Sequence, residues 1–338
     1  MKLYCGIDLH SNNNVVVILD EVDKVVYQKK LNNDLPSILQ QLSVYKSEVT
    51  AIAIESTFNW YWLVDGLMEA GYTVKLVNTA AVQIYSGLKH SDDEDDARWL
   101  AHLLRLGILP TGFIYPREER AVRDLLRKRS QLVRQSTTNI LSLQNILARN
   151  TAHSLSSYRI KKLDDELAEQ LIDDPNITLA LKSNLNVIRC LQNTIDEIET
   201  TVLQQTRIRT EFKQLLTVSG IGEILGLTIM LESGDMSRFA KVGNFSSYCR
   251  CVKSGRFSNG KKKGEGNRKN GNKYLAWAFI EAANFAIRYN DKVKAFYQKK
   301  KSKTNGIIAT KAVANKLARA CYHILKDQVP FDVNKAFT

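Results

Sequence analysis

Four acidic residues in the first third of the chain have the types and positions of a metal site. Asp8 and Glu55 each close a short apolar run, and Asp93 and Asp96 form an i, i+3 pair that shares one face of a helix. Mg²⁺ prefers carboxylate oxygens and binds beside phosphates. We therefore expect these four carboxylates to converge on Mg²⁺ and to act on a phosphodiester. His10 is either near this metal or, as is commoner for an isolated histidine, in a surface loop.

The register of the helix expected over 92–106 decides which acidic pair faces inward, because Asp92 and Asp95 form a second i, i+3 pair. Small and apolar residues mark the inward face: Ala97, Leu100, Ala101 and Leu104. Steps of three or four residues back from this stripe reach Asp93 and Asp96. The alternative is an acidic cluster that only stabilises the helix N-terminus, which explains the outward acids better than the inward ones.

A serine within a basic segment is the second candidate group. Residues 253–273 contain one acid, Glu265, and eight cations: Lys253, Arg256, Lys261, Lys262, Lys263, Arg268, Lys269 and Lys273. Such a segment cannot bury a core, so we expect a flexible loop that attracts phosphate. Ser258 lies among these cations and can approach a phosphorus atom. Because the sequence shows no Ser-His-Asp signature, its hydroxyl would need a metal or a carboxylate to lose its proton.

The charge balance of the 338-residue chain favours a polyanionic partner. Lysine and arginine number 48 against 35 acids, for a formal net charge of +13. Nucleic acid is the expected partner, and an anionic membrane surface is the competitor. We find no apolar stretch of membrane-spanning length and no signal peptide, so we expect a soluble, cytoplasmic protein. Of the five cysteines only Cys249 and Cys251 are close in sequence, which favours reduced thiols over a zinc site.

The elements that must position the carboxylates form an α/β pattern over residues 1–115. Five short apolar or β-branched runs are expected strands: 2–8, 14–20, 24–31, 49–55 and 72–77. Turn-length gaps separate the first three, and helix-length gaps separate the last three. This order is the one found in RNase H-like (RuvC-like) domains, so we expect that fold by analogy.

Long helices are expected over residues 116–209. Apolar residues recur with helical spacing in 117–150 and 177–205, and from Ile188 to Val202 the spacing has a heptad rhythm. We expect a helical coiled-coil arm for oligomerisation; a helical spacer packed within one domain is the alternative. Five basic residues are expected to contact nucleic acid from the outside of the first helix: Arg120, Arg123, Arg127, Arg129 and Arg134.

Residues 210–338 are expected to form an all-α domain that also carries the serine segment. Gly220-Ile221-Gly222 stands between two helical runs, as in a helix-hairpin-helix whose glycine turn presents backbone N–H groups to a phosphate. An ordinary corner between two helices is the alternative. An apolar helix follows the basic segment and would anchor it.

Several of these motifs together resemble the DEDD transposases of the Piv-type, insertion-sequence-110 family. Three N-terminal segments carry Asp8, Glu55 and the pair Asp93 and Asp96: GIDLH, AIAIEST and KHSDDEDDARWLA. Two C-terminal segments resemble the family's Gly-Ile-Gly turn and its serine segment: VSGIGEILG and FSNGKKKGEGNRKNGNKYLAWAF. The resemblance covers most of the chain.

The chain also departs from the family pattern. One extra residue separates Lys89 from the first aspartate, Phe257 and Asn259 replace the more usual serine and glycine, and Arg-Cys-Val at 250–252 replaces a proline-containing turn. Because these departures surround the serine, Ser254 is the alternative to Ser258.

The resemblance implies a site-specific DNA recombinase that inserts and excises its own mobile element. An RNase H-like domain would hold Mg²⁺ through Asp8, Glu55, Asp93 and Asp96, and Ser258 of a helical transposase domain would attack DNA to form a covalent 5′-phosphoserine link. The implied partners are double-stranded donor and target DNA, a structured non-coding bridge RNA, and further copies of the chain as dimers that assemble into tetramers. Two half-sites would make one active centre, in a nucleoid-associated bacterial protein.

Two other interpretations compete with a recombinase. A RuvC-like nuclease would use the same carboxylates to activate water on branched DNA, with Ser258 only contacting a phosphate. A non-catalytic nucleic-acid scaffold would leave the four acids without a role.

Overall fold

The computed structural model describes residues 1–82, 93–152, 154–206, 209–252, 255–264 and 270–337. Its contacts divide the chain into two compact units, Met1–Arg117 and Glu118–Thr338. The first break lies close to the boundary expected after residue 115. The expected second boundary, after residue 209, falls inside the second unit, and a separate arm domain stays a prediction.

The first unit contains a five-stranded sheet in the order β3-β2-β1-β4-β5. The strands are β1 Leu3–Leu9, β2 Asn13–Leu19, β3 Val25–Asn32, β4 Val49–Glu55 and β5 Val74–Val77. The first three pair antiparallel, whereas β1, β4 and β5 run parallel. All five expected strands are present. The apolar runs of β1, β2 and β4 are buried on both faces, whereas the edge strand β3 alternates half-buried and exposed residues over much of its length.

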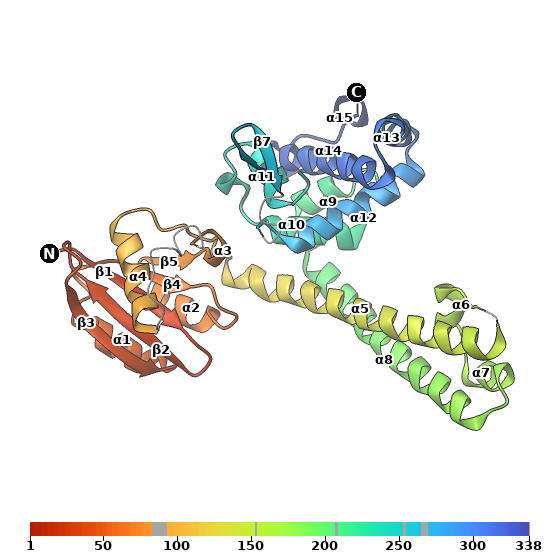
Figure 1. Cartoon of the computed structure of the whole chain (residues 1–338), viewed down its shortest axis with the longest axis horizontal. Helices are drawn as coiled ribbons and strands as arrows, with labels where there is room; N and C mark the ends of the chain where they lie inside the picture. Colours follow the sequence, from red (N-terminus) through yellow and green to blue (C-terminus); the bar gives the residue numbers. More distant parts are fainter. Residues whose placement is uncertain (83–92, 153, 207–208, 253–254, 265–269, 338) are drawn as a thin grey trace. The chain divides into compact units, whose positions relative to one another are not determined.

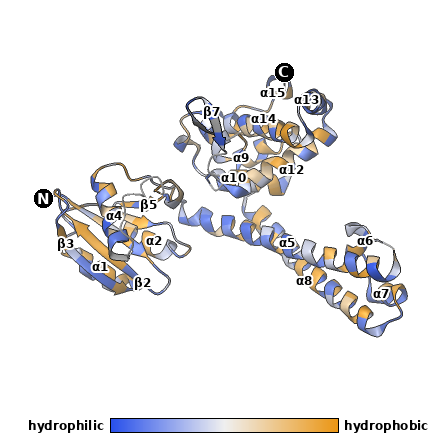
Figure 2. Cartoon of the chain, in the orientation of Figure 1, coloured by the Kyte–Doolittle hydropathy of each residue, from blue (hydrophilic) through white to orange (hydrophobic). Residues whose placement is uncertain are grey.

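Helices cover both faces of this sheet (Figure 1). They are α1 Leu35–Ser43, α2 Tyr61–Glu69, α3 Thr79–Val82 and α4 Asp93–Arg105. Residues of α1 and α2 pack with Cys5, Ile7 and Ile54 on one face, whereas Ala97 and Ala101 of α4 pack on the other. Figure 2 shows the apolar residues along the strands between these layers. This mixed α/β arrangement is consistent with an RNase H-like layout.

The second unit begins with two long antiparallel helices joined by two short ones (Figure 1). They are α5 Arg117–Thr151, α6 Ser157–Lys161, α7 Asp165–Leu171 and α8 Pro175–Thr206. At the far end Leu143 and Leu185 belong to a small separate core. At the near end Leu126 and Val202 belong to the main core of the unit. The expected pair of long helices is therefore present, and its base shares a core with the C-terminal helices.

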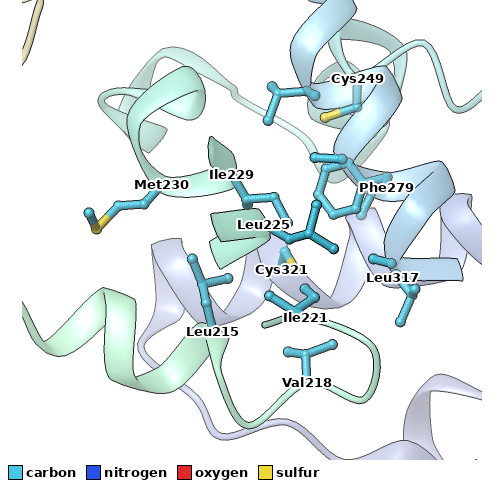
Figure 3. Packing of buried hydrophobic residues seen from close by; sticks show 14 of the residues in the cluster. Leu215, Val218, Ile221, Leu225, Ile229, Met230, Cys249, Phe279, Leu317 and Cys321 are labelled. Atoms are coloured by element: carbon cyan, nitrogen blue, oxygen red, sulfur yellow. The ribbon is translucent and has the colours of Figure 1, made fainter. Parts of the chain in front are cut away.

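The remaining helices of the second unit surround one apolar core. They are α9 Thr210–Leu215, α10 Glu223–Ser233, α11 Val242–Tyr248, α12 Lys273–Tyr289, α13 Asp291–Lys303, α14 Gly306–Asp327 and α15 Val333–Ala336, with a 3₁₀ turn at Met236–Arg238. Figure 3 shows Ile221, Ile229, Phe279 and Leu317 meeting in this core.

The Gly-Ile-Gly turn between α9 and α10 is part of this packing. Gly220 has φ +86°, and a Cβ there would lie 2.2 Å from the carbonyl oxygen of Ala282 in α12. The turn therefore needs glycine for backbone conformation and for helix contact. A phosphate-binding helix-hairpin-helix stays a prediction.

Candidate active site

Asp8 and Glu55 lie at the ends of neighbouring parallel strands. Ile7 of β1 is in register with Ile54 of β4, so the next residues in each strand, Asp8 and Glu55, are adjacent at the same edge of the sheet. Because side chains alternate along a strand and Ile7 and Ile54 face α1 and α2, both acids face α4. Asp8 is only 2% exposed.

Gly6 allows α4 to lie directly on the acidic face of the sheet. A Cβ at Gly6 would be 2.0 Å from the carbonyl oxygen of Ala97 and 2.7 Å from the amide nitrogen of Ala101. No other residue type fits there without moving the helix, because the neighbouring atoms are backbone. The close contact fixes the height of α4 above β1.

A cluster at the other end of α4 sets the direction of the helix. Asp23, in the turn after β2, accepts a 2.7 Å hydrogen bond from Nε of Arg105 and lies 2.9 Å from Nδ1 of His102. Because β2 is antiparallel to β1, this turn lies beside the start of β1. The helix therefore runs opposite to β1, and its first turn, with Asp96, lies toward the edge that carries Asp8.

The helix register agrees with the expected apolar stripe. Ala97, Leu100 and Ala101 are buried, and one carboxylate oxygen of Asp96 is also buried. Asp93 begins α4, but its side chain lies outside the described part of the chain, as does Asp92. Among the described residues, no three carboxylate, imidazole or thiol groups are placed closely enough to hold a metal ion. The four-carboxylate metal site accordingly stays a prediction.

His10 lies against Asp8 in the connection between β1 and β2, and its side chain is 39% exposed. Its Nε2 is 3.1 Å from Oδ2 of Asp8. The backbone carbonyl of His10 accepts 3.0 Å hydrogen bonds from the side-chain amides of Asn33 and Asn59. The hydroxyl of Thr57 in turn donates to Asn59 at 2.9 Å. His10 therefore lies both beside a predicted metal ligand and in an exposed connection, and its role stays a prediction.

Ser258 lies at the tip of a β-hairpin. Strands β6 Arg256–Ser258 and β7 Lys261–Gly264 pair antiparallel, and Ser258 pairs with Lys261. The two turn residues, Asn259 and Gly260, have φ of 49° and 71°, as a type I′ turn requires. The expectation of a flexible loop is therefore wrong over 256–264, since Asn-Gly between two extended runs is a strong hairpin signal.

The hairpin presents the serine beside exposed cations. Ser258, Lys261 and Lys263 are exposed. The other candidate residues between 253 and 269 lie wholly or by their side chains outside the described residues: Lys253, Ser254, Arg256, Lys262, Arg268 and Lys269. Lys273 is exposed at the start of α12, with Nζ 5.2 Å from the centre of the Tyr274 ring. The choice between Ser258 and Ser254 stays open.

Hydrogen bonds join the two chain segments that flank the hairpin. The amide of Asn272 donates to the carbonyl of Tyr248 at 2.7 Å, and Arg250 donates to the carbonyls of Asn270 and Gly271, both at 2.9 Å. Gly271 has φ +83°, and a Cβ there would lie 2.5 Å from the carbonyl oxygen of Tyr248. These two flanking segments, residues 248–250 and 270–272, are here called the stem of the hairpin. The stem is held by contacts to backbone atoms that tolerate little change.

A buried carboxylate connects this stem to α5. Glu232, 3% exposed, accepts two hydrogen bonds from Arg127, Nε to Oε1 at 2.6 Å and Nη2 to Oε2 at 2.8 Å. Nδ2 of Asn272 also donates to Oε2 at 2.7 Å. Burial alone would lower the pKa of Arg127, but the bonds to Glu232 raise it well above its usual value, so the pair is ionic. The sequence offered no signal for this partnership.

The five arginines expected to contact nucleic acid differ in their surroundings. Arg120 and Arg123 are each 4% exposed, and Arg127 is bound to Glu232. Arg129 forms a 2.6 Å ion pair with Glu199 of α8, whereas Arg134 is exposed. The first four are therefore buried or bound to acidic residues of the protein itself. All five remain predicted contacts with nucleic acid.

All five cysteines are free thiols, as expected. Burial raises the pKa of Cys251 to about 12 and that of Cys249 well above its usual value. Both side chains therefore stay protonated and neutral at physiological pH. No helix in the described ranges is both long and apolar enough to cross a membrane.

Comparison with known families matches two parts of the chain. Residues 5–151 match a family model described as Transposase, built on the DEDD type of insertion sequence 110. Residues 213–298 match the model described as Transposase IS116/IS110/IS902 family. The first match contains Asp8, Glu55 and α4, and the second contains Ser258 and Asn272. No curated protein matches the chain. Both candidate sites thus lie within matched segments, and the chain belongs to the insertion-sequence-110 family of DEDD transposases, which are DNA-processing enzymes.

Proposed function

We propose that the chain is a site-specific recombinase that cleaves and rejoins DNA strands with Mg²⁺ through a covalent 5′-phosphoserine. The observation that carries the proposal is the placement of Asp8, Glu55 and the first turn of α4 on one face and at one edge of the sheet. Acidic residues from three separate elements lie on this side of the sheet, and a basic protein with a nucleic-acid substrate has no other evident use for them.

The residues at this edge suit Mg²⁺. Asp8 and Glu55 offer hard oxygen donors, Asp96 comes from the same face, and Asp93 is the fourth proposed ligand. A carboxylate as buried as Asp8 is stable only when an opposite charge or hydrogen bonds compensate for its lost hydration. Bound there, Mg²⁺ would supply charge that stabilises a phosphodiester during displacement at phosphorus. His10, with Nε2 3.1 Å from Oδ2 of Asp8, would help to hold that carboxylate in place.

Ser258 is the proposed nucleophile. Its Oγ forms a bond to phosphorus while the bond from phosphorus to the 3′ oxygen of the DNA breaks. The cut strand is left with a 3′ hydroxyl on one side of the break and a 5′-phosphoserine on the other. The serine proton passes to a carboxylate of the site, and the departing 3′ oxygen takes up a proton. Attack by a second 3′ hydroxyl reverses these steps and releases the serine, so strand exchange needs no outside energy source.

Two further features complete the proposal. A structured non-coding RNA would act as the guide that selects donor and target DNA, and the net charge of +13 suits two nucleic-acid partners. The long helices α5 and α8 would support assembly of dimers into tetramers, because each helix also has exposed residues outside the face that packs within the chain.

A covalent-adduct assay tests the serine chemistry. Protein, DNA carrying the element ends, the guide RNA and Mg²⁺ are incubated and quenched with denaturant, and protein attached to DNA is measured on a gel. We expect the adduct with the wild type and with Ser254→Ala, and none with Ser258→Ala. Asp96→Asn should reduce the adduct by at least about a hundredfold, the scale of removing one charged catalytic group.

The same assay separates the recombinase from the RuvC-like nuclease. Cut DNA ends without any attached protein would contradict the serine mechanism and favour hydrolysis by the carboxylates alone. Adduct formation by Asp96→Asn at the wild-type level would contradict the proposed role of the carboxylates.

A further inference from the structure

Helix α13 carries a concentration of positive charge outside both candidate sites. Its 13 residues contain one acid, Asp291, and six lysines: Lys292, Lys294, Lys299, Lys300, Lys301 and Lys303. All six lysines are exposed, and Val293 is the buried residue that anchors the helix. In Figure 1 α13 and the hairpin strand β7 lie at opposite ends of α14, so this charge is separate from that around Ser258.

One face of α13 borders a groove, here called the α13 groove. Its volume is about 560 Å³, and its principal lining residues are Lys292, Phe296, Lys299, Lys300, Lys303 and Asn334. The α13 positions recur at intervals of three, four or seven residues and so lie on one side of the helix. Lys294 and Lys301 point to the opposite side, since each helical residue advances by about 100°.

Aromatic rings form a fixed base for the groove. The rings of Phe296 and Phe337 meet edge to face at 5.5 Å, joining α13 to the segment after α15. Nζ of Lys316, in α14, lies 5.1 Å and 5.8 Å from the two ring centres and donates to the carbonyl of Ala336 at 2.8 Å. Lys292 also donates to Asn334 across the groove. The groove is therefore held by contacts among three helices and gains a further cation beside it.

The lysines of the groove have no acidic partner among the residues that the structure describes. Within the described part of the chain, no carboxylate lines the groove, and none of its four lysines forms an ion pair with an acid. Like charges held together on one helix face repel each other, so a polyanion bound there is stabilised by all of them at once. Lysine supplies point charges that suit phosphate oxygens rather than the forked hydrogen bonds with which arginine reads bases.

Duplex DNA is the polyanion that fits. A transposase acts on DNA, and the helix rises roughly 16 Å from Lys292 to Lys303 at about 1.5 Å per residue. One DNA strand presents a phosphate about every 3.4 Å along its axis, so the row of lysines along the groove spans roughly five phosphates. We propose that the α13 groove binds the sugar-phosphate backbone of duplex DNA without reading its sequence. The inference rests on DNA as the substrate and not on the serine chemistry.

The salt dependence of DNA binding tests this surface. The affinity of the full-length chain for a fluorescent DNA duplex is measured at several salt concentrations in EDTA, so that cleavage plays no part. Lys299→Gln with Lys303→Gln should weaken binding and reduce the slope of log affinity against log salt by about 1.8, because each phosphate contact contributes about 0.9. The matched control, Lys294→Gln with Lys301→Gln, removes the same charge from the opposite side and should leave the slope unchanged.

Two outcomes would overturn the inference. Equal slopes for both double variants would mean that the lysines act only through net charge. A loss confined to an RNA duplex of the same length, with DNA binding unchanged, would assign the groove to RNA. Circular dichroism of both variants checks that the helix remains folded. Failure of the Ser258 adduct assay would leave these binding results unaffected, so the two proposals can fail separately.

Discussion

Glu232 joins three parts of the second unit through one buried carboxylate. It binds Arg127 of α5 and Asn272 at the start of α12, and the Asn272 side chain also accepts hydrogen bonds from the amides of Tyr274 and Leu275. Glu232 therefore links the base of the long helices, through Arg127, to Asn272, which caps α12 and donates a hydrogen bond to Tyr248 in the stem of the Ser258 hairpin. Loss of this carboxylate should therefore weaken the packing at the base of the long helices, at the start of α12 and at the stem.

We expect Glu232→Ala to lower the free energy of unfolding of the second unit by about 3 kcal/mol, because the largely buried Arg127 would lose both of its short hydrogen bonds and keep only Asp124, 3.7 Å away, as an acidic partner among the described residues. Urea unfolding followed by circular dichroism measures the change. Glu119→Ala is the control, since it removes an α5 carboxylate whose partner, Arg209, is 42% exposed, and it should cost about 1 kcal/mol or less. Equal losses in the two variants would contradict a special role for Glu232.

At the scale of elements, the direction of α4 depends on the cluster around Asp23. Burial would raise the pKa of Asp23, but hydrogen bonds from Arg105 and His102 outweigh it and lower the pKa below 3.8. A carboxyl whose pKa is lower in the folded state contributes stability above its unfolded pKa, and that contribution disappears as the pH falls through the folded pKa. The tie between α4 and the β2–β3 turn should therefore weaken in acid.

Asp23→Asn tests this tie with little change to the backbone, because Asp23 has φ 64° and asparagine tolerates that region. We expect the variant to be less stable than the wild type by up to about 1 kcal/mol at pH 7, since the pair is near the surface. The difference should shrink as the pH falls below about 4. Urea titrations from pH 7 to pH 3 measure it, and a difference that does not change with pH would show that Asp23 acts through something other than its charge.

The Ser258 hairpin is a second element whose form follows from a short sequence. Asn259 and Gly260 adopt positive φ at low cost, and this turn matches the twist of the two strands. A rigid two-residue turn places the serine hydroxyl more reproducibly than a flexible loop would, which suits a nucleophile that must meet a phosphorus atom in line.

At the scale of the whole molecule, the two units have separate apolar cores. The sheet and its helices form the cores of the first unit, and α5 to α15 form those of the second. Separate cores predict two unfolding transitions. The proposed Mg²⁺ ligands are all in the first unit, whereas Glu232 and its partners are in the second.

Calorimetry of the full chain should therefore show a Mg²⁺-dependent shift in one transition only. With Mg²⁺ at a hundredfold excess over its Kd, binding adds about 2.7 kcal/mol to the stability of the unit that binds it. Asp8→Asn should abolish the shift, and Glu69→Gln, which removes an exposed carboxylate of the same unit, should retain it. Glu232→Ala identifies the other transition. A shift that persists in Asp8→Asn would contradict Asp8 as a ligand.

Much of the fold was predictable because its signals are local. Runs such as Val15 to Leu19 are continuous apolar stretches of strand length, and the stripe through Ala97 and Ala101 repeats with the period of a helix. Those signals predicted the five strands along the chain, the two long helices and the side of α4 that faces the sheet. The acidic residues at strand ends followed from the same local patterns.

Only the tertiary structure decided which charged groups have partners. Arg127 and Glu232 are 105 residues apart, and nothing in either segment indicates the other. The same holds for the α13 groove, where lysines on one helix meet residues beyond α14. The sequence by itself determined the elements and the candidate chemistry, because short-range sterics and hydrophobic periodicity act within a few residues. The availability of each cation depends on long-range packing, because burial and ion pairing depend on which surfaces the folded chain brings together.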